Sequence, residues 1–428
     1  MKNLRYIQLC VLLTGASSLL GCKQPEVVEK KDPTLEVSEF PIRVWIASPV
    51  SDIPIIQRQW QAGSEQPIEI KQVQPQDLLG KENPEADVLV FPARLIGDLI
   101  AKGAIQHIPE NATKDDEGNE TLPALAAERT QVQFARKIYG ASLGCSIPVA
   151  IASNKLAEQM STPLNWDSLL GKLETGSAGN WPADVDHNAL VDRYLFVLGT
   201  LVEKNPTYGL LFEVVKMKSR LKAPEFLRAC EVLQRLAEQP GGRAAFLSSH
   251  SDAWIWSATN QTSVLGIACP TELSDEATSV KEGAILEVEH ANLIGWNTGG
   301  GLIAALSSTC QQTSHSLAVL KWLQDGQTRG VVAPLVIGIE AEQPDVELLT
   351  WKARDASRAA LDSDTLPFEP SLPRALDYRA ALAKELLAFL RGDVTAEQAM
   401  SNTDQAWQEI SGDDLNNLSR AYEQSLGL

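Results

Sequence analysis

Tryptophan residues near polar side chains are the part of this sequence best suited to chemistry. The chain has 10 Trp, against 6 Tyr and 9 Phe. A flat aromatic face can stack on the apolar side of a sugar ring, and a polar group beside it can fix the hydroxyls. The competing interpretation is that these rings pack in cores or at their rims. The candidate binding residues are Trp45, Asp52, Arg94, Trp181, Asp252, Trp254, Trp256, Trp296 and Asn297.

Two groups of these candidates lie in the second half of the chain. Asp252, Trp254 and Trp256 occupy alternate positions of an expected strand and therefore share one face. Trp296 and Asn297 directly precede a run of three glycines, a pattern typical of a turn. Because the chain is acidic, polyamines or other cations are the second choice of ligand after a carbohydrate.

The first hundred residues alternate between strand and helix patterns, which predicts a parallel sheet covered by helices. An apolar run at residues 87–91 is typical of a strand buried on both faces. Because ligands bind beyond the carboxyl ends of parallel strands, the candidate site includes residues 48–52 with Asp52 and residues 92–94 with Arg94. The expected strands are 42–47, 68–73 and 87–91, and the expected helices are 52–61 and 94–102, the last ended by Gly103.

Beyond residue 147 the patterns predict a second α/β block, so the chain divides into two lobes and crosses between them more than once. No short-period repeat is present. The expected strands are 149–152, 252–257, 264–268, 286–290 and 302–306. The expected helices are 164–173, 189–204, 224–238, 242–248 and 314–324, followed by a helical tail from Pro373 with turns near 392–393 and 411–412.

Charge and composition exclude some classes of protein. The 428 residues are 44% hydrophobic and 21% charged, which fits a globular protein with sizeable cores. The net charge of −18 and the lack of a basic cluster argue against a nucleic-acid partner. The first twenty residues are the one candidate for membrane insertion, which argues against a multi-span membrane protein.

The N-terminus has the pattern of an export signal. Lys2 and Arg5 precede the largely apolar segment 7–20, and Gly21-Cys22 follows it. This order resembles a bacterial lipoprotein signal peptide. The resemblance implies cleavage before Cys22 and acyl chains, palmitate among them, on that residue; the alternative is an ordinary secretory signal. Residues 1–21 are then the signal and 22–39 a tether that is too polar to build a core. Cleavage changes the net charge from −18 to −20.

The remaining cysteines are Cys145, Cys230, Cys269 and Cys310, an even number for an oxidising compartment. Disulfides and free thiols are both open. If a pair forms, Cys145 with Cys269 is favoured, because each directly follows an apolar segment and precedes a proline.

One motif is typical of serine hydrolases, but its context argues against that function. Residues 140–144 match G-x-S-x-G around Ser142, but a nucleophile elbow needs a helix directly after the serine, and a strand is expected there. Asp252 and His290 could complete a triad, although nothing in their contexts favours it. The five histidines lack metal-ligand spacing and no phosphate-binding loop occurs, so we expect no catalysis, no metal and no cofactor.

A set of short segments, spread over nearly the whole chain after the tether, carries a recognisable order and spacing. The segments are Ile42–Trp45, Asp87–Leu99 with Gly103–Ile105, Tyr139–Gly144, Asn154–Leu156, Pro163–Leu169, Gly299–Ala304, His315–Leu323 and Tyr378–Ile410. No single motif is specific, but taken in order they resemble the extracellular solute-binding proteins of ABC importers, in particular the large maltose-binding-like group. The chain departs at Ser153, where the family has Tyr, at Ser142, where it has Pro, and at residues 345–372, which have no counterpart.

The resemblance implies a two-lobed periplasmic-binding-protein fold of type II, with residues 41–146 and 275–345 in lobe 1 and 147–274 and 346–428 in lobe 2. It implies a monomer that closes on a solute and delivers it to permease subunits, extracytoplasmic and lipid-anchored through Cys22. The family also favours Trp254 and Trp296 as cleft residues. The alternative is a binding lipoprotein that serves as a sensor or scaffold.

Overall fold

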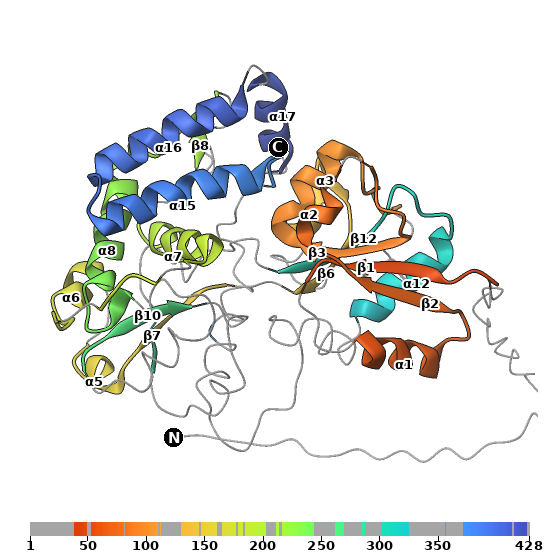
Figure 1. The fold of residues 1–428 in the computed structure, drawn as a ribbon, viewed down its shortest axis with the longest axis horizontal. Helices are drawn as coiled ribbons and strands as arrows, with labels where there is room; N and C mark the ends of the chain where they lie inside the picture. Colours follow the sequence, from red (N-terminus) through yellow and green to blue (C-terminus); the bar gives the residue numbers. More distant parts are fainter. Residues whose placement is uncertain are drawn as a thin grey trace, which may run out of the picture. The chain divides into compact units, whose positions relative to one another are not determined.

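The computed structural model describes residues from Ser38 to Ser425, with gaps. The residues left out between these ends are 49–52, 81, 110–111, 113–129, 145–146, 161–164, 177–178, 183–184, 203–210, 214–215, 244–261, 269–283, 287–300, 325–355, 357–370 and 413–414. The fold is mixed α/β, as expected from the sequence, and is built around two sheets and a group of packed helices (Figure 1).

A five-stranded sheet has the order β2-β1-β3-β12-β6. β1 is parallel to β2 and β3, whereas β12 is antiparallel to β3 and β6. The predicted parallel arrangement is thus confirmed for the first three strands. The strands are β1 (Ile42–Ile46), β2 (Ile68–Gln72), β3 (Val88–Pro92), β6 (Ala141–Gly144) and β12 (Leu302–Leu306).

Helices cover both faces of this sheet because its central strands are apolar on both sides. On one face, Ile56 and Trp60 of α1 (Ile53–Gly63) share a core with α12 (Thr313–Gln324). On the other face lie α2 (Pro75–Leu78), a short 3-10 helix η1 (Ala93–Leu95) and α3 (Ile96–Lys102). The helix predicted over 94–102 is therefore divided into η1 and α3. α3 ends at Gly103, whose φ of 68° is readily adopted by glycine.

A three-stranded sheet has the order β10-β7-β11, with β7 (Val149–Ala152) antiparallel to β10 (Leu265–Ala268) and β11 (Ala284–Leu286). The division of the chain into lobes at residues 146, 274 and 345 stays a prediction. The strand predicted over 252–257 lies outside the described residues.

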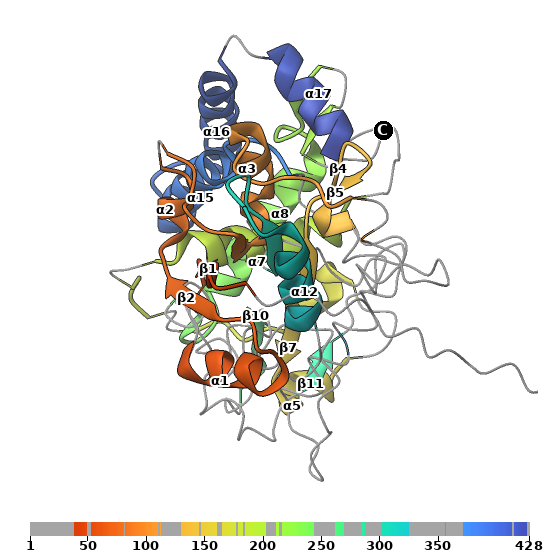
Figure 2. The same cartoon turned by 90° about the vertical axis from the view of Figure 1, so that its right-hand side faces the viewer.

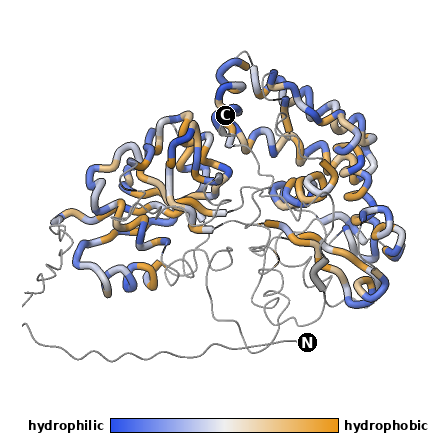
Figure 3. Tube along the Cα trace, turned by 180° about the vertical axis from the view of Figure 1, so that it is seen from behind, coloured by the Kyte–Doolittle hydropathy of each residue, from blue (hydrophilic) through white to orange (hydrophobic). Residues whose placement is uncertain are grey.

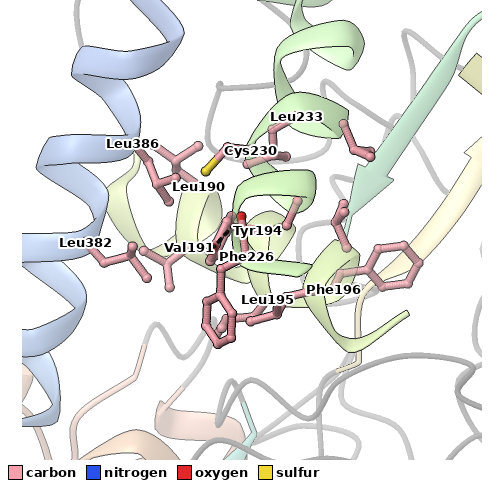
Figure 4. Close-up of a cluster of buried hydrophobic side chains, with 14 of the residues drawn as sticks. Leu190, Val191, Tyr194, Leu195, Phe196, Phe226, Cys230, Leu233, Leu382 and Leu386 are labelled. Carbon is pink, nitrogen blue, oxygen red and sulfur yellow. Dashed lines mark hydrogen bonds between the residues drawn. The ribbon is translucent and has the colours of Figure 1, made fainter. Parts of the chain in front are cut away.

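A helical core packs beside the three-stranded sheet. α7 (His187–Gly199) is buried on nearly every side from Ala189 onward, so it is a core helix rather than a surface one. Around it are α8 (Pro224–Ala237), α15 (Ala375–Arg391) and α16 (Ala396–Ser411). Figure 4 shows Tyr194 of α7 inside this core, where its hydroxyl donates to the Phe226 carbonyl at 3.2 Å.

N-capping explains why two helices begin at residues other than those predicted. α7 begins at His187 rather than Ala189 because the Asp186 side chain accepts hydrogen bonds from the first backbone N–H groups. The helix predicted over 164–173 is α6 (Trp166–Leu170), which Asn165 caps in the same way. The remaining elements are α5 (Asn154–Ala157), α17 (Leu415–Ser425), and the hairpins β4 (Gln133–Phe134) with β5 (Lys137–Ile138) and β8 (Phe212–Glu213) with β9 (Lys218–Ser219).

Hydropathy follows this architecture. In Figure 3 the strands are largely hydrophobic, while α16 and α17 alternate between hydrophobic and hydrophilic positions, as helices with one packed face do. Within the described residues, no helix combines the length and apolar character needed to cross a membrane.

Candidate functional site

The carboxyl ends of β1 and β3 meet at one edge of the five-stranded sheet, as the sequence predicted. At this edge the Ala47 N–H donates to the Val90 carbonyl at 2.7 Å, and the Ala93 N–H donates to the Gly301 carbonyl at 2.8 Å. β12 therefore begins where β3 ends. Loops from distant parts of the chain meet here, which is where such sheets bind ligands.

Arg94 is the residue at this edge whose surroundings most clearly indicate a binding role. It follows β3 within η1, and its Nε is buried without a hydrogen-bond partner. Leaving a buried charged donor unpaired costs free energy, so such a group is kept where a ligand or water completes it. A guanidinium in this position can donate to a hydroxyl or to an anionic group. Its predicted place beyond the third strand is confirmed.

Trp45 lies on β1, on the sheet face covered by α2 and α3. Its ring is partly buried against that core, and the Lys71 ammonium lies 4.5 Å from the ring centroid. Trp45 and Lys71 are paired positions of β1 and β2, so the contact is a cross-strand cation–π pair. One face of the ring is therefore already occupied.

Trp181 belongs to a different core. Its ring is partly buried against the residues of the helical core, and the guanidinium carbon of Arg243 lies 5.1 Å from its centroid. The structure thus places Trp45 on the five-stranded sheet and Arg94 at the carboxyl edge of that sheet. Trp181 packs against the helical core instead. The other predicted binding residues, which lie outside the described residues, are Asp52, Asp252, Trp254, Trp256, Trp296 and Asn297.

Ser142 is not placed as a catalytic nucleophile would be. It lies within β6, is 0% exposed, and its Oγ accepts a hydrogen bond from the Gly144 N–H at 3.1 Å. A nucleophile elbow instead exposes the serine between a strand and a helix. Among the described residues, no three His, Cys, Asp or Glu side chains gather in a group that could hold a metal ion.

Two glutamines that the sequence did not single out hold the end of β6. Gln324 of α12 donates to the Ser142 carbonyl at 3.3 Å, and the Ser142 Oγ donates to Gln131 Oε1 at 3.4 Å. No sequence pattern marks them, because isolated glutamines occur throughout soluble proteins. They position the strand end that lies beside β12 at the candidate edge.

Ser153, which stands where the related family has tyrosine, caps α5. Its Oγ accepts from the Leu156 N–H at 3.3 Å and donates to the Thr262 carbonyl at 2.6 Å. Ser153 is buried and its hydroxyl is hydrogen-bonded to the backbone, so it stabilises the fold at this point rather than contacting a ligand.

Cys230 and Cys310 are free thiols. Burial of Cys230 in the helical core raises the pKa of its thiol to about 12, so the group stays protonated and inert at neutral pH. The favoured pair Cys145 and Cys269, and the lipidation candidate Cys22, lie outside the described residues.

No family model matches the sequence, and no curated protein matches it either. Solved structures do match. MalX from Streptococcus pneumoniae, in complex with maltopentaose, is 14% identical with a TM-score of 0.58, over 86% of this chain and 100% of that one. An ABC substrate-binding protein from Listeria monocytogenes, in complex with cycloalternan, is 12% identical with a TM-score of 0.61, over 87% and 98%.

A third match has a smaller ligand. An ABC transporter solute-binding protein from Agrobacterium vitis, with bound D-mannitol, is 12% identical with a TM-score of 0.55, over 87% of this chain and 98% of that one. The match covers nearly the full length of each of these three proteins. At such identities the likeness shows the fold: the chain has the two-lobed α/β fold of periplasmic binding proteins that these sugar-binding structures share, which confirms the fold expected from the sequence.

Proposed function

We propose that the chain is the extracytoplasmic solute-binding component of an ABC import system, which binds a carbohydrate between its lobes and delivers it to permease subunits. The observation that carries the proposal is the buried, unpartnered Nε of Arg94 at the carboxyl edge of a sheet with this fold. A sugar hydroxyl can accept a hydrogen bond from it. The protein binds without catalysing a reaction.

The structural matches support a sugar as the solute, since their own ligands are maltopentaose, cycloalternan and D-mannitol. Aromatic rings would cover the apolar side of such a ligand. Trp254, Trp256 and Trp296 remain the proposed platforms, with Asn297 and Asp252 as polar partners. Polyamines are the second class, because the chain is acidic.

Thermal unfolding in the presence of candidate solutes tests the proposal. We expect maltodextrins, smaller sugars or sugar alcohols to raise the melting temperature, because a ligand that binds only the folded state stabilises it by mass action, about 2.7 kcal/mol at a hundredfold excess over Kd. Polyamines and amino acids serve as the comparison set. No response to any sugar, together with a response to another class, would overturn the carbohydrate assignment.

We further propose that Cys22 carries the lipid that tethers the protein to the membrane. Replacing Cys22 with alanine is expected to move the protein from the membrane fraction to the soluble fraction, because two or more acyl chains provide stable anchoring and the variant has none. Fractionation followed by immunoblotting measures the change, and Cys230→Ala is the matched control. Membrane retention of the Cys22 variant would contradict the proposed anchor.

A further inference from the structure

A pocket of about 400 Å³ is lined by residues of α3 and of the C-terminal helices, and Arg94 is not among the lining residues. One wall is α3, and the others are β4, the start of α15, the end of α16 and α17. A volume of this size is within the range of small-molecule sites, roughly 300–1,000 Å³. Figure 2 shows α17 beside β4 and β5, and residues of α17 are part of the lining.

Two walls of the pocket are shaped by close backbone contacts. Gly97 and Ala101 are small residues on the α3 wall, and the backbone of Ser371 and Leu372 lies where a Cβ on Gly97 would be. α17 is held at the opposite side by the Gln424 carbonyl, which accepts a hydrogen bond from the Ala135 N–H at 3.1 Å. Ala135 has a φ of 51° in the β4–β5 turn, so this anchor depends on a specific turn conformation.

The lining combines an apolar floor with cationic groups. Ile100, Phe134 and Leu418 supply apolar surface, and among the described lining residues the charged ones are Arg374 and Arg420. This composition is unusual on a chain of net charge −18. An apolar body with an anionic head complements it.

The two arginines differ in their freedom to bind. Arg374 is fixed, because its Nε donates to Asp377 at 2.9 Å and its Nη1 donates to the Ile410 carbonyl at 2.6 Å. Arg420 is exposed on α17 and has no hydrogen-bond or ion-pair partner among the described residues. Its guanidinium fork is therefore available to a carboxylate.

We propose that this pocket is a second ligand site, separate from the solute site, which takes small amphipathic carboxylates. The aliphatic or aromatic body packs on Ile100, Phe134 and Leu418, and Arg420 pairs with the carboxylate at the rim.

Calorimetric titration of the full chain with octanoate tests the site, with 1-octanol as the uncharged probe. Arg420→Gln is expected to weaken octanoate by about fivefold, the upper end for an exposed ion pair, and to leave 1-octanol unchanged. Ala101→Leu is expected to abolish binding of both probes, because its side chain fills the pocket. Arg391→Gln and Ala62→Leu, at exposed helical positions outside the pocket, are the matched controls.

Arg94→Ala is expected to leave octanoate affinity unchanged, which separates this site from the proposed solute site. Absence of any octanoate heat up to millimolar concentration would overturn the proposal. Octanoate binding that neither Arg420→Gln nor Ala101→Leu alters would also overturn it, because the probe would then bind elsewhere.

Discussion

Replacing Asp192 with alanine is expected to lower the free energy of unfolding by about 3–5 kcal/mol, the usual cost of breaking a buried ion pair. The Asp192 carboxylate accepts from the Arg379 guanidinium between α7 and α15, and the two side chains are 9% and 3% exposed. The Asn188 carbonyl also accepts from Arg379, at 3.0 Å, but it carries no charge. The variant removes that carboxylate from beside a guanidinium that is only 3% exposed. Urea unfolding followed by circular dichroism measures the loss.

Two further variants test the physical reason for that loss. Glu238→Ala breaks the exposed Arg235–Glu238 pair and should cost less than about 1 kcal/mol. Asp192→Ala combined with Arg379→Met removes both charges and should recover much of the stability. A single Asp192 variant as stable as the Glu238 variant would show that the buried pair contributes little.

Removing the Arg94 side chain is expected to weaken binding of the proposed sugar about 10–100-fold, since a hydrogen bond to a charged group contributes about 1.5–3 kcal/mol. The loss of stability should be small, because the buried Nε has no hydrogen bond to lose. The expected result is therefore a lower affinity with little change in the melting temperature. Calorimetric titration with the sugar that gives the largest thermal shift measures the affinity.

The matched control is Arg58→Ala, because Arg58 is an exposed arginine on α1. It should change neither affinity nor melting temperature. Arg94→Lys keeps the charge but not the planar fork, so an intermediate affinity is expected. A sugar affinity within twofold of the original in Arg94→Ala would place the solute contact elsewhere and refute the role proposed for Arg94.

Local sequence patterns were sufficient to predict the strands and helices whose own residues show a clear strand or helix pattern. β3 was predicted from its apolar run, and α3 from its helical pattern followed by Gly103. β6 was not predicted, because its four residues become a strand only through pairing with β12, far along the chain. The β4–β5 hairpin was also missed. Its turn residues Ala135 and Arg136 have φ values of 51° and 60°, and neither residue type is typical of this left-handed conformation.

The sequence was sufficient to predict which edge of the sheet holds the site, but not the individual contacts there. Arg94 was singled out because it is a polar residue directly after the third expected strand. Trp45 and Trp181 were proposed from residue type alone, which cannot show that Lys71 and Arg243 already lie against their rings. The second pocket has no sequence signature, because its walls come from helices separated by more than two hundred residues.

The position of β12 in the sheet has a consequence for how the protein is made. β12 pairs with β3, yet about 210 residues separate the two strands along the chain. At roughly 5–20 residues per second, a ribosome takes about 10–40 s to add that stretch. During this time β3 has no partner on one side, and an unpaired apolar strand edge can join another chain and aggregate. Synthesis of this protein should therefore depend on a chaperone that shields the nascent sheet until residue 306 has emerged.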